Sequence, residues 1–147
     1  MDLHKIFDYD DGLLLNKAGH IYCNLDKDGY IRVRTNGKEY RAHRIIWEMF
    51  NGPIPEGLLI DHIDGDKLNN RIDNLRIATR RQNRANSRAP EFAELPKGVT
   101  RLASGKYRAK LTYTFSLGTF DTPEEAAEAY NNKAIELHGE FARIDNE

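Results

Sequence analysis

The chain of 147 residues has a hydrophobic content of 39% and a charged content of 31%, which excludes a disordered protein and suits one larger globular domain or two small ones. No apolar run approaches the roughly 20 residues of a membrane helix, and the first twelve residues lack a signal-peptide pattern, so an intracellular, cytoplasmic protein without a membrane partner is expected. The one cysteine, Cys23, excludes an internal disulfide and a cysteine-rich zinc site.

Charge is unevenly distributed along the chain, although the net charge is only -1. Residues 1–30 carry a net charge of -3, residues 31–120 carry +8 and residues 121–147 carry -6. A basic face for nucleic acid can therefore exist on a nearly neutral protein. For each single basic cluster, ordinary solvated surface charge is the alternative interpretation.

The first forty residues read as short strands joined by tight turns. Three pairs have the composition of hairpin turns, because glycine tolerates positive φ: Asp11-Gly12, Asp28-Gly29 and Asn36-Gly37. A strand is predicted over residues 30–35, with Arg32 and Arg34 on one face. These arginines could follow a phosphate backbone, or the strand could be an ordinary half-buried one.

Residues 41–50 form a predicted short helix. Its apolar stripe comprises Ala42, Ile45, Ile46, Met49 and Phe50. The glycine and prolines of residues 51–55 end it. His43 is expected to be a packed, hydrogen-bonded histidine outside any functional site.

The stretch over residues 58–88 is predicted to fold as strand, loop, strand and basic helix. Asp61 and His62 end the first strand, where consecutive side chains point to opposite sides and can divide metal binding from proton transfer. Phosphodiester hydrolysis needs both functions, and an unperturbed imidazole, with a pKa of about 6.5, is a competent base near neutral pH. Thr79 and Gln82 form a capping box, which places Asn83 in the first turn of the helix as a second oxygen ligand.

The end of this stretch is strongly basic. Five arginines occur with no acidic residue among them: Arg76, Arg80, Arg81, Arg84 and Arg88. Such a helix suits contact with phosphates.

Two segments, AHRIIWEMFNGPIP and LIDHIDGDKLNNRIDNLRIATRRQNRAN, resemble the HNH endonucleases of the His-Me finger (ββα-metal) superfamily, in the phage homing-endonuclease style. The resemblance implies that Asp61 binds metal and that His62 is the general base. It also implies that Asn74 orients this histidine through the loop and that Asn83 completes the metal site. Asn70 matches the family's loop and is interpreted as a loop organiser.

The resemblance also implies a reaction and a cofactor. One divalent metal is expected, Mg²⁺ first and Mn²⁺ as the alternative, with no zinc. Double-stranded DNA would be nicked or cut to leave 5′-phosphate and 3′-hydroxyl ends, and Arg71 would contact a phosphate or the leaving group. A monomeric phage or prophage product is expected.

The C-terminal part is predicted to be a separate small domain. Residues 89–96 contain two prolines and read as a linker, and strands are predicted over residues 97–101, 106–113 and 114–120. A helix starts at a second capping box, Thr122-Pro-Glu-Glu125, and ends at Gly139.

The pattern K-G-V, G-K-Y-R-A-K-L and L-G-T-F-D-T-P-E-E-A-A-E-A-Y resembles the ethylene-response-factor (AP-two) DNA-binding domain, whose three-stranded sheet enters the major groove. The resemblance puts four basic residues on the DNA face: Arg101, Lys106, Arg108 and Lys110.

These observations predict an α+β protein. Residues 1–88 would form a ββα-metal nuclease domain preceded by short β-hairpins, residues 89–96 a linker, and residues 97–147 a three-stranded antiparallel sheet with one helix. A metal-dependent DNA endonuclease is the expected function. A non-catalytic DNA-binding regulator with a vestigial nuclease module is the alternative.

Overall fold

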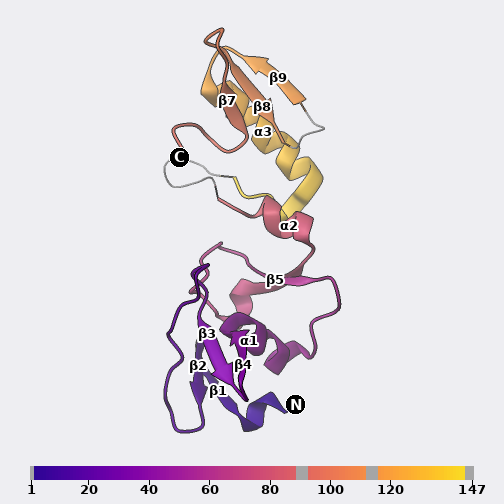
Figure 1. The fold of residues 1–147 in the computed structure, drawn as a ribbon. Coiled ribbons are helices and arrows are strands. Elements are labelled where there is room, and N and C mark those ends of the chain that lie inside the picture. Colours follow the sequence, from indigo (N-terminus) through magenta and orange to yellow (C-terminus); the bar gives the residue numbers. More distant parts are fainter. Residues whose placement is uncertain (1, 89–92, 112–115, 145–147) are drawn as a thin grey trace. The chain divides into compact units, whose positions relative to one another are not determined.

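The computed structural model of the chain describes residues 2–88, 93–111 and 116–144 (Figure 1). The chain divides into two compact units, Met1–Arg80 and Arg81–Glu147. No helix in the described ranges is long and apolar enough to cross a membrane.

The first unit begins with a 3-10 turn, η1 (Leu3–Lys5), and contains two antiparallel hairpins. Strands β1 (Phe7–Asp10) and β2 (Leu13–Asn16) form one, and strands β3 (Arg32–Thr35) and β4 (Lys38–Arg41) form the other.

Two of the three predicted turns join these strands. Asp11 and Gly12 have φ of 43° and 95°, and Asn36 and Gly37 have φ of 50° and 72°, as a two-residue hairpin turn requires. The third pair, Asp28-Gly29, is flanked only by the isolated bridge Leu25↔Ile31, and the strand predicted over residues 30–35 begins at Arg32.

The predicted helix is α1 (Ala42–Asn51), and it ends at Gly52, whose φ is 78°. Ala42, Ile45 and Ile46 are buried as expected. Phe50 was predicted to share this stripe, but it is 50% exposed. Its ring instead lies 5.0 Å from that of Tyr9 in an edge-to-face contact on the surface of the unit.

The predicted strand–loop–strand–helix order is observed. Strands β5 (Leu59–His62) and β6 (Leu75–Ala78) are antiparallel, the loop between them ends in a 3-10 turn, η2 (Ile72–Asn74), and helix α2 is Arg80–Ala85. Apolar side chains from the hairpins, α1 and the β5–β6 pair share one core that includes Phe7, Leu14, Val33, Ile45, Ile46, Ile60 and Leu75. This core fixes the β5–β6 pair against the N-terminal hairpins.

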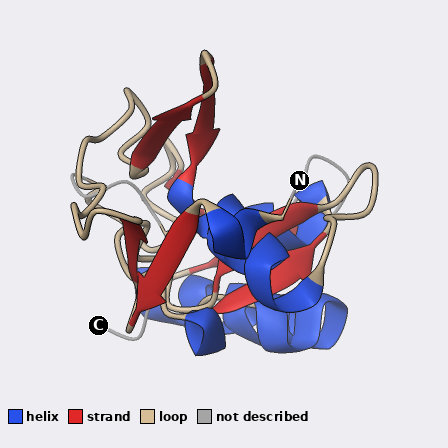
Figure 2. Ribbon diagram, turned by 90° about the horizontal axis from the view of Figure 1, so that it is seen from below, coloured by secondary structure: helices blue, strands red, loops and turns tan. Residues whose placement is uncertain are grey.

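The second unit contains a three-stranded antiparallel sheet in the order β7-β8-β9 (Val99–Arg101, Tyr107–Lys110 and Ser116–Phe120). Helix α3 (Pro123–His138) contacts all three strands, and the 3-10 turn η3 (Gly139–Phe141) follows it. Figure 2 shows the strands of these small sheets in red and the loops between them in tan. The predicted sheet and helix are therefore observed, although residues 112–113 of the expected second strand, residues 114–115 of the expected third strand and residues 89–92 of the expected linker lie outside the described ranges.

The predicted start of α3 is confirmed. Thr122 and Glu125 form the reciprocal capping box of α3, with Pro123 in the first turn. Gly98 precedes β7 with φ of 77°, and a Cβ atom there would collide with the ring of Tyr130. Only glycine allows α3 to approach the sheet so closely at this point.

Candidate functional site

Strand β5 holds the predicted metal ligand and the predicted base on opposite faces. Asp61 lies across from Arg76, and His62 lies across from Leu75, in the register with β6. Cross-strand partners share a face, so the carboxylate faces an arginine and the imidazole is on the other side. Both side chains are buried, each residue being 4% exposed.

The carboxylate of Asp61 is paired across the two strands. Arg76 donates from Nε to Asp61 Oδ2 at 2.9 Å, and the two side chains are 14% and 5% exposed. A buried carboxylate requires such a partner, because desolvation penalises an isolated charge. Arg76, expected only as part of a phosphate-binding run, therefore has a place beside the predicted metal ligand.

The imidazole of His62 is held by the loop. Its Nε2 atom lies 2.8 Å from Oδ1 of Asn70, a residue that is only 1% exposed. When the amide oxygen accepts this bond, Nε2 carries the proton, and the neutral ring keeps its basic lone pair on Nδ1. Nδ2 of Asn70 is buried with no hydrogen-bond partner among the described residues.

Asn74 organises the loop from its far end. Its Nδ2 donates to Asp64 Oδ1 at 2.9 Å and to the carbonyl of Asn69 at 2.8 Å, and its Oδ1 accepts from the Asp64 amide at 3.1 Å. Asn74 thus makes the direct contacts to the loop, and Asn70 makes the direct contact to His62. The catalytic role of Asn74 remains a prediction.

The carboxylate of Asp64 is the centre of this loop network. Burial raises the pKa of the Asp64 carboxyl, but hydrogen bonds from Asn74, Asn69 and the amide of Asp66 outweigh that effect and place its pKa below the ordinary value. The carboxylate therefore stays ionised and holds the loop together near neutral pH.

The first hairpin supports the same loop from outside. The hydroxyl of Tyr9 accepts from the amide of Ile72 at 3.1 Å, and Arg71 pairs with Asp11 at 2.6 Å. A Cβ on Gly12 would lie 3.1 Å from the amide nitrogen of Arg71, so the turn and the loop are in close contact. Arg71 was predicted to contact DNA; its exposed side chain is engaged by acidic residues of its own unit.

Two aromatic neighbours of His62 come from elsewhere in the chain. The ring of His43 lies 5.0 Å from that of His62, and Tyr30 lies 6.0 Å from His62 and 5.0 Å from His43. Burial, followed by the charge of His62, lowers the pKa of His43 to about 3, so this ring is neutral. His43 was expected outside the site, and Tyr30 was not considered. Only the position of His43 on the same helical face as Ile46 could have indicated burial.

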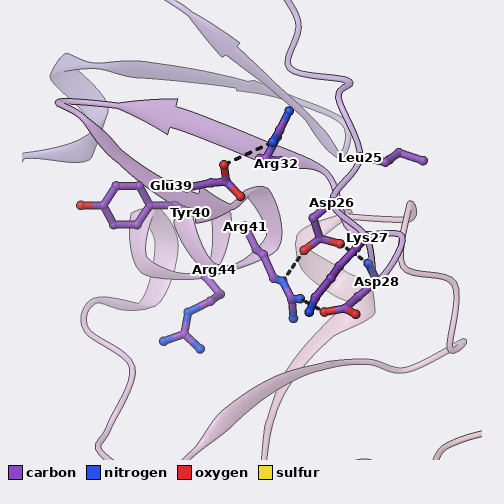
Figure 3. A pocket seen from close by; sticks show the side chains of 9 residues that line it. All are labelled: Leu25, Asp26, Lys27, Asp28, Arg32, Glu39, Tyr40, Arg41 and Arg44. Atoms are coloured by element: carbon purple, nitrogen blue, oxygen red, sulfur yellow. Dashed lines mark hydrogen bonds and ion pairs between the residues drawn. The ribbon is translucent and has the colours of Figure 1, made fainter.

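A surface hollow of about 590 Å³ is lined by residues of the 25–28 segment, of the β3–β4 hairpin and of the start of α1 (Figure 3). Arg41 bridges the carboxylates of Asp26 and Asp28 there, at 2.8 Å and 2.5 Å, and its guanidinium lies 4.2 Å from the centroid of the Tyr30 ring. Arg32, a predicted DNA contact, is 3.4 Å from Glu39 in the same hollow. Arg34 is exposed on the same face of β3 as Arg32.

Helix α2 carries the predicted metal ligand Asn83 and three of the predicted DNA-binding arginines. Arg80, Arg81 and Arg84 are exposed, and Asn83 is half-buried. Lys97 donates to the carbonyl of Ala85 at 2.8 Å, which fixes the end of the helix. Asn83 belongs to the second unit, so the expectation that it binds one metal ion together with Asp61 rests on the sequence alone.

The register of the second sheet separates two residues that were expected on one DNA face. Arg108 lies across from Thr100 and from Thr119, on the face away from buried Ala109. Arg101 lies across from Tyr107, which packs into the core, so Arg101 does not share the face of Arg108. The prediction that Arg101 shares a face of the sheet with Arg108 is therefore wrong.

The other two basic residues flank strand β8. Lys106 precedes the strand and is 3.1 Å from Asp121, and Lys110 ends it at a register shift. Lys110 lies two residues after Arg108 in β8, which agrees with the predicted common face, and the DNA contacts expected of Lys106 and Lys110 remain predictions.

The donor atoms at β5 suit a hard divalent cation. Asp61 offers a carboxylate, and Arg76 engages one of its two oxygens. Among the described residues, no three His, Cys, Asp or Glu side chains gather to hold a metal, and Cys23 is exposed. A carboxylate and an amide oxygen, with water completing the shell, is the kind of site that Mg²⁺ uses.

Part of the chain matches a known protein family, and the chain resembles several known proteins. Residues 40–85 match the HNH endonuclease family. The uncharacterized HNH endonuclease L560 of Acanthamoeba polyphaga mimivirus is 38% identical over 80% of this chain and 63% of its own length. Protein 3.8 of Escherichia phage T7 is 39% identical over 73% of this chain and 92% of its own length. The chain thus spans less than two thirds of the mimivirus relative and nearly all of the T7 relative.

A third relative has a solved structure. DNA endonuclease I-HmuI of Bacillus phage SP01 is 27% identical over 76% of this chain and 67% of its own length. The structure describing DNA binding and cleavage by this HNH homing endonuclease matches 55% of this chain and 51% of that chain, with 33% identity and a TM-score of 0.45.

Proposed function

The chain belongs to the HNH endonuclease family, and on this premise we propose that it is a metal-dependent DNA endonuclease of the homing type. The observation that carries the proposal is the buried imidazole of His62, held at Nε2 by Asn70 and adjacent in β5 to the carboxylate of Asp61. A buried base with one fixed nitrogen, next to a carboxylate, is the arrangement that metal-assisted phosphodiester hydrolysis requires.

His62 accepts a proton from water at Nδ1 as the water oxygen attacks phosphorus. The new P–O bond forms as the bond to the 3′-oxygen breaks, and this oxygen leaves with a proton from solvent. The products carry 5′-phosphate and 3′-hydroxyl ends. Asp61 and Asn83 would hold one divalent ion, Mg²⁺ or Mn²⁺, which when bound supplies positive charge for the phosphate and the leaving oxygen.

Asn70 and Asn74 keep the base in place. Asn70 holds the ring at Nε2, and Asn74 holds the loop that carries Asn70. With these two hydrogen bonds, the imidazole of His62 stays oriented although the loop that follows β5 is at the surface.

Double-stranded DNA is the proposed partner. The exposed arginines of α2 and Arg34 of β3 suit phosphate contacts, and the open face of β8 with Arg108 suits the groove contact implied by the AP-two resemblance. The protein would act as a monomer in the host cytoplasm and would nick DNA or cut both strands.

The second candidate function is a DNA-binding regulator without catalysis. The same basic surfaces favour it, because they do not depend on His62 or Asp61. Incubation of supercoiled plasmid with the protein in Mg²⁺, in Mn²⁺ and in excess chelator separates the two. Metal-dependent conversion to open-circular or linear DNA supports the endonuclease, and DNA retardation without cleavage in either metal supports the regulator.

A further inference from the structure

Three rings meet beside strand β5. Tyr30, His43 and His62 lie with ring centroids 5.0 to 6.0 Å apart, and the two imidazoles are only 5% and 4% exposed. The ring centroids of Tyr30 and His62 lie 6.0 Å apart and their planes are inclined by 33°, so the two rings are neighbours in a tilted arrangement. The imidazole of His62 therefore contacts aromatic side chains that do not belong to its own loop.

The ring of Tyr30 is itself held by cations. The guanidinium of Arg41 lies 4.2 Å from its centroid, and Nζ of Lys67 lies 5.0 Å from it. Cations over an aromatic face are attracted to its electron density. Arg41 is in turn fixed by two carboxylates of the 26–30 segment, as Figure 3 shows.

One hydrogen bond joins the loop that carries Asn70 to the segment that carries Tyr30. Lys67 donates from Nζ to the carbonyl of Asp28 at 2.8 Å. Lys67 belongs to the loop that carries Asn70, and Asp28 belongs to the segment that carries Tyr30. The loop that fixes Nε2 of His62 and the segment that places the Tyr30 ring beside the imidazole are thus joined by a hydrogen bond.

We propose that Tyr30 is a positioning residue for His62: its ring, held by Arg41 and Lys67, keeps the imidazole in the orientation in which Asn70 binds Nε2. This inference rests on the proposed function, in which His62 is the base. Tyr30 lies outside residues 40–85, which match the HNH family, so the N-terminal region contributes to the site and is more than an attachment to it.

The test compares Tyr30→Leu, which removes the ring, with Tyr30→Phe, which keeps it. Tyr40→Leu is the matched control, because Tyr40 lies in β4 and is 37% exposed. Cleavage of a plasmid at saturating DNA gives kcat, and the DNA dependence gives KM. In Tyr30→Leu, kcat should fall about ten- to a hundred-fold with KM unchanged, because a small misplacement of a catalytic group has such a cost. Tyr30→Phe should restore kcat to within about two-fold, and Tyr40→Leu should match the wild type.

Proton–carbon NMR of the imidazoles provides a readout without catalysis. The chain has five histidines, so single variants assign their signals. Tyr30→Leu should move the signals of His62 and His43, which lie beside the ring, and should leave exposed His20 in place. If the wild type cleaves nothing, the proposed function fails, while unchanged His62 signals in Tyr30→Leu overturn the positioning role on their own.

Lys67→Met covers the case in which Tyr30→Leu does not fold. Lys67 is exposed, so its removal should leave the core intact while it breaks the bond to Asp28. Lower kcat with shifted His62 signals would support the proposal. Wild-type kcat with unshifted signals, or a Tyr30→Phe variant as impaired as Tyr30→Leu, would overturn it.

Discussion

Nε2 of His62 and Oδ1 of Asn70 are joined by a buried hydrogen bond of 2.8 Å between the end of strand β5 and the loop that follows it. Eight residues of chain separate the two, and Asn70 is almost fully enclosed. The bond orients the ring of His62 and favours the tautomer protonated at Nε2, so in the proposed mechanism it controls whether Nδ1 can accept a proton from water.

Replacing Asn70 tests this control. Asn70→Ala should lower kcat for DNA cleavage about a hundred-fold while DNA affinity stays the same, because the ring loses its orientation but the phosphate contacts remain. Single-turnover cleavage and DNA retardation measure the two effects. Asn69→Ala is the matched control, since Asn69 bonds Asp64 and not His62. Equal losses of cleavage in both variants would show that the loop as a whole, rather than the bond to His62, is required.

The Asp61–Arg76 pair should contribute to stability as well as to the site. Arg76→Met leaves a buried carboxylate without this partner and should cost about 3–5 kcal/mol in the free energy of unfolding when a chelator is present. Fluorescence of Trp47, the one tryptophan, follows urea unfolding of the first unit, because it packs against that unit's core. Arg32→Met removes the exposed pair with Glu39 and should cost about 0–1 kcal/mol. A similar small loss in Arg76→Met would mean that the pair is not buried in solution.

His43 should make stability depend on pH. Its pKa falls from 6.5 to about 3 on folding, so the unfolded chain binds the extra proton between these values and stability is lost as pH falls below about 6.5. The slope from this residue is at most about 1.4 kcal/mol per pH unit. In urea unfolding followed by Trp47 at pH 7 and pH 5, His43→Gln should lose less stability than the wild type. Exposed His20→Gln should behave as the wild type does, and an unchanged pH dependence in His43→Gln would contradict the buried, neutral ring.

Arg108 and Arg101 form a matched pair for DNA binding, because the sheet register places them on different faces. Arg108→Ala should weaken DNA binding at all sequences and should reduce the salt dependence of log affinity by about 0.9, as the loss of one phosphate contact does. Arg101→Ala should have the smaller effect. Retardation of DNA at several salt concentrations measures both. A larger effect of Arg101→Ala would mean that DNA does not contact the open face of β8.

Local patterns in the sequence predicted most of the elements. The Asp-Gly and Asn-Gly pairs gave the hairpin turns, and the capping box of Thr122 and Glu125 gave the start of α3. The Asp61-His62 pair at the end of an apolar run gave the position of β5. These features depend on residues close together in the chain, which is why single-sequence patterns capture them.

The contacts of His62 could not be predicted in the same way. Asn69, Asn70 and Asn74 lie in one loop, and which of them reaches the imidazole depends on how the loop closes. Tyr30 reaches His62 only because the N-terminal segment folds over the loop. Likewise, the face of Arg101 depends on its pairing with Tyr107, which no alternation within one strand reveals.

The most direct test of the central claim is cleavage of supercoiled plasmid in Mg²⁺ by His62→Ala, with exposed His20→Ala as the control. If His62 is the base, His20→Ala should cleave as the wild type does, and His62→Ala should retard DNA with wild-type affinity but cleave it more slowly by a factor of about 10² or more. Cleavage by His62→Ala at the wild-type rate would contradict this role of His62, because the proton of the attacking water would then go to another group.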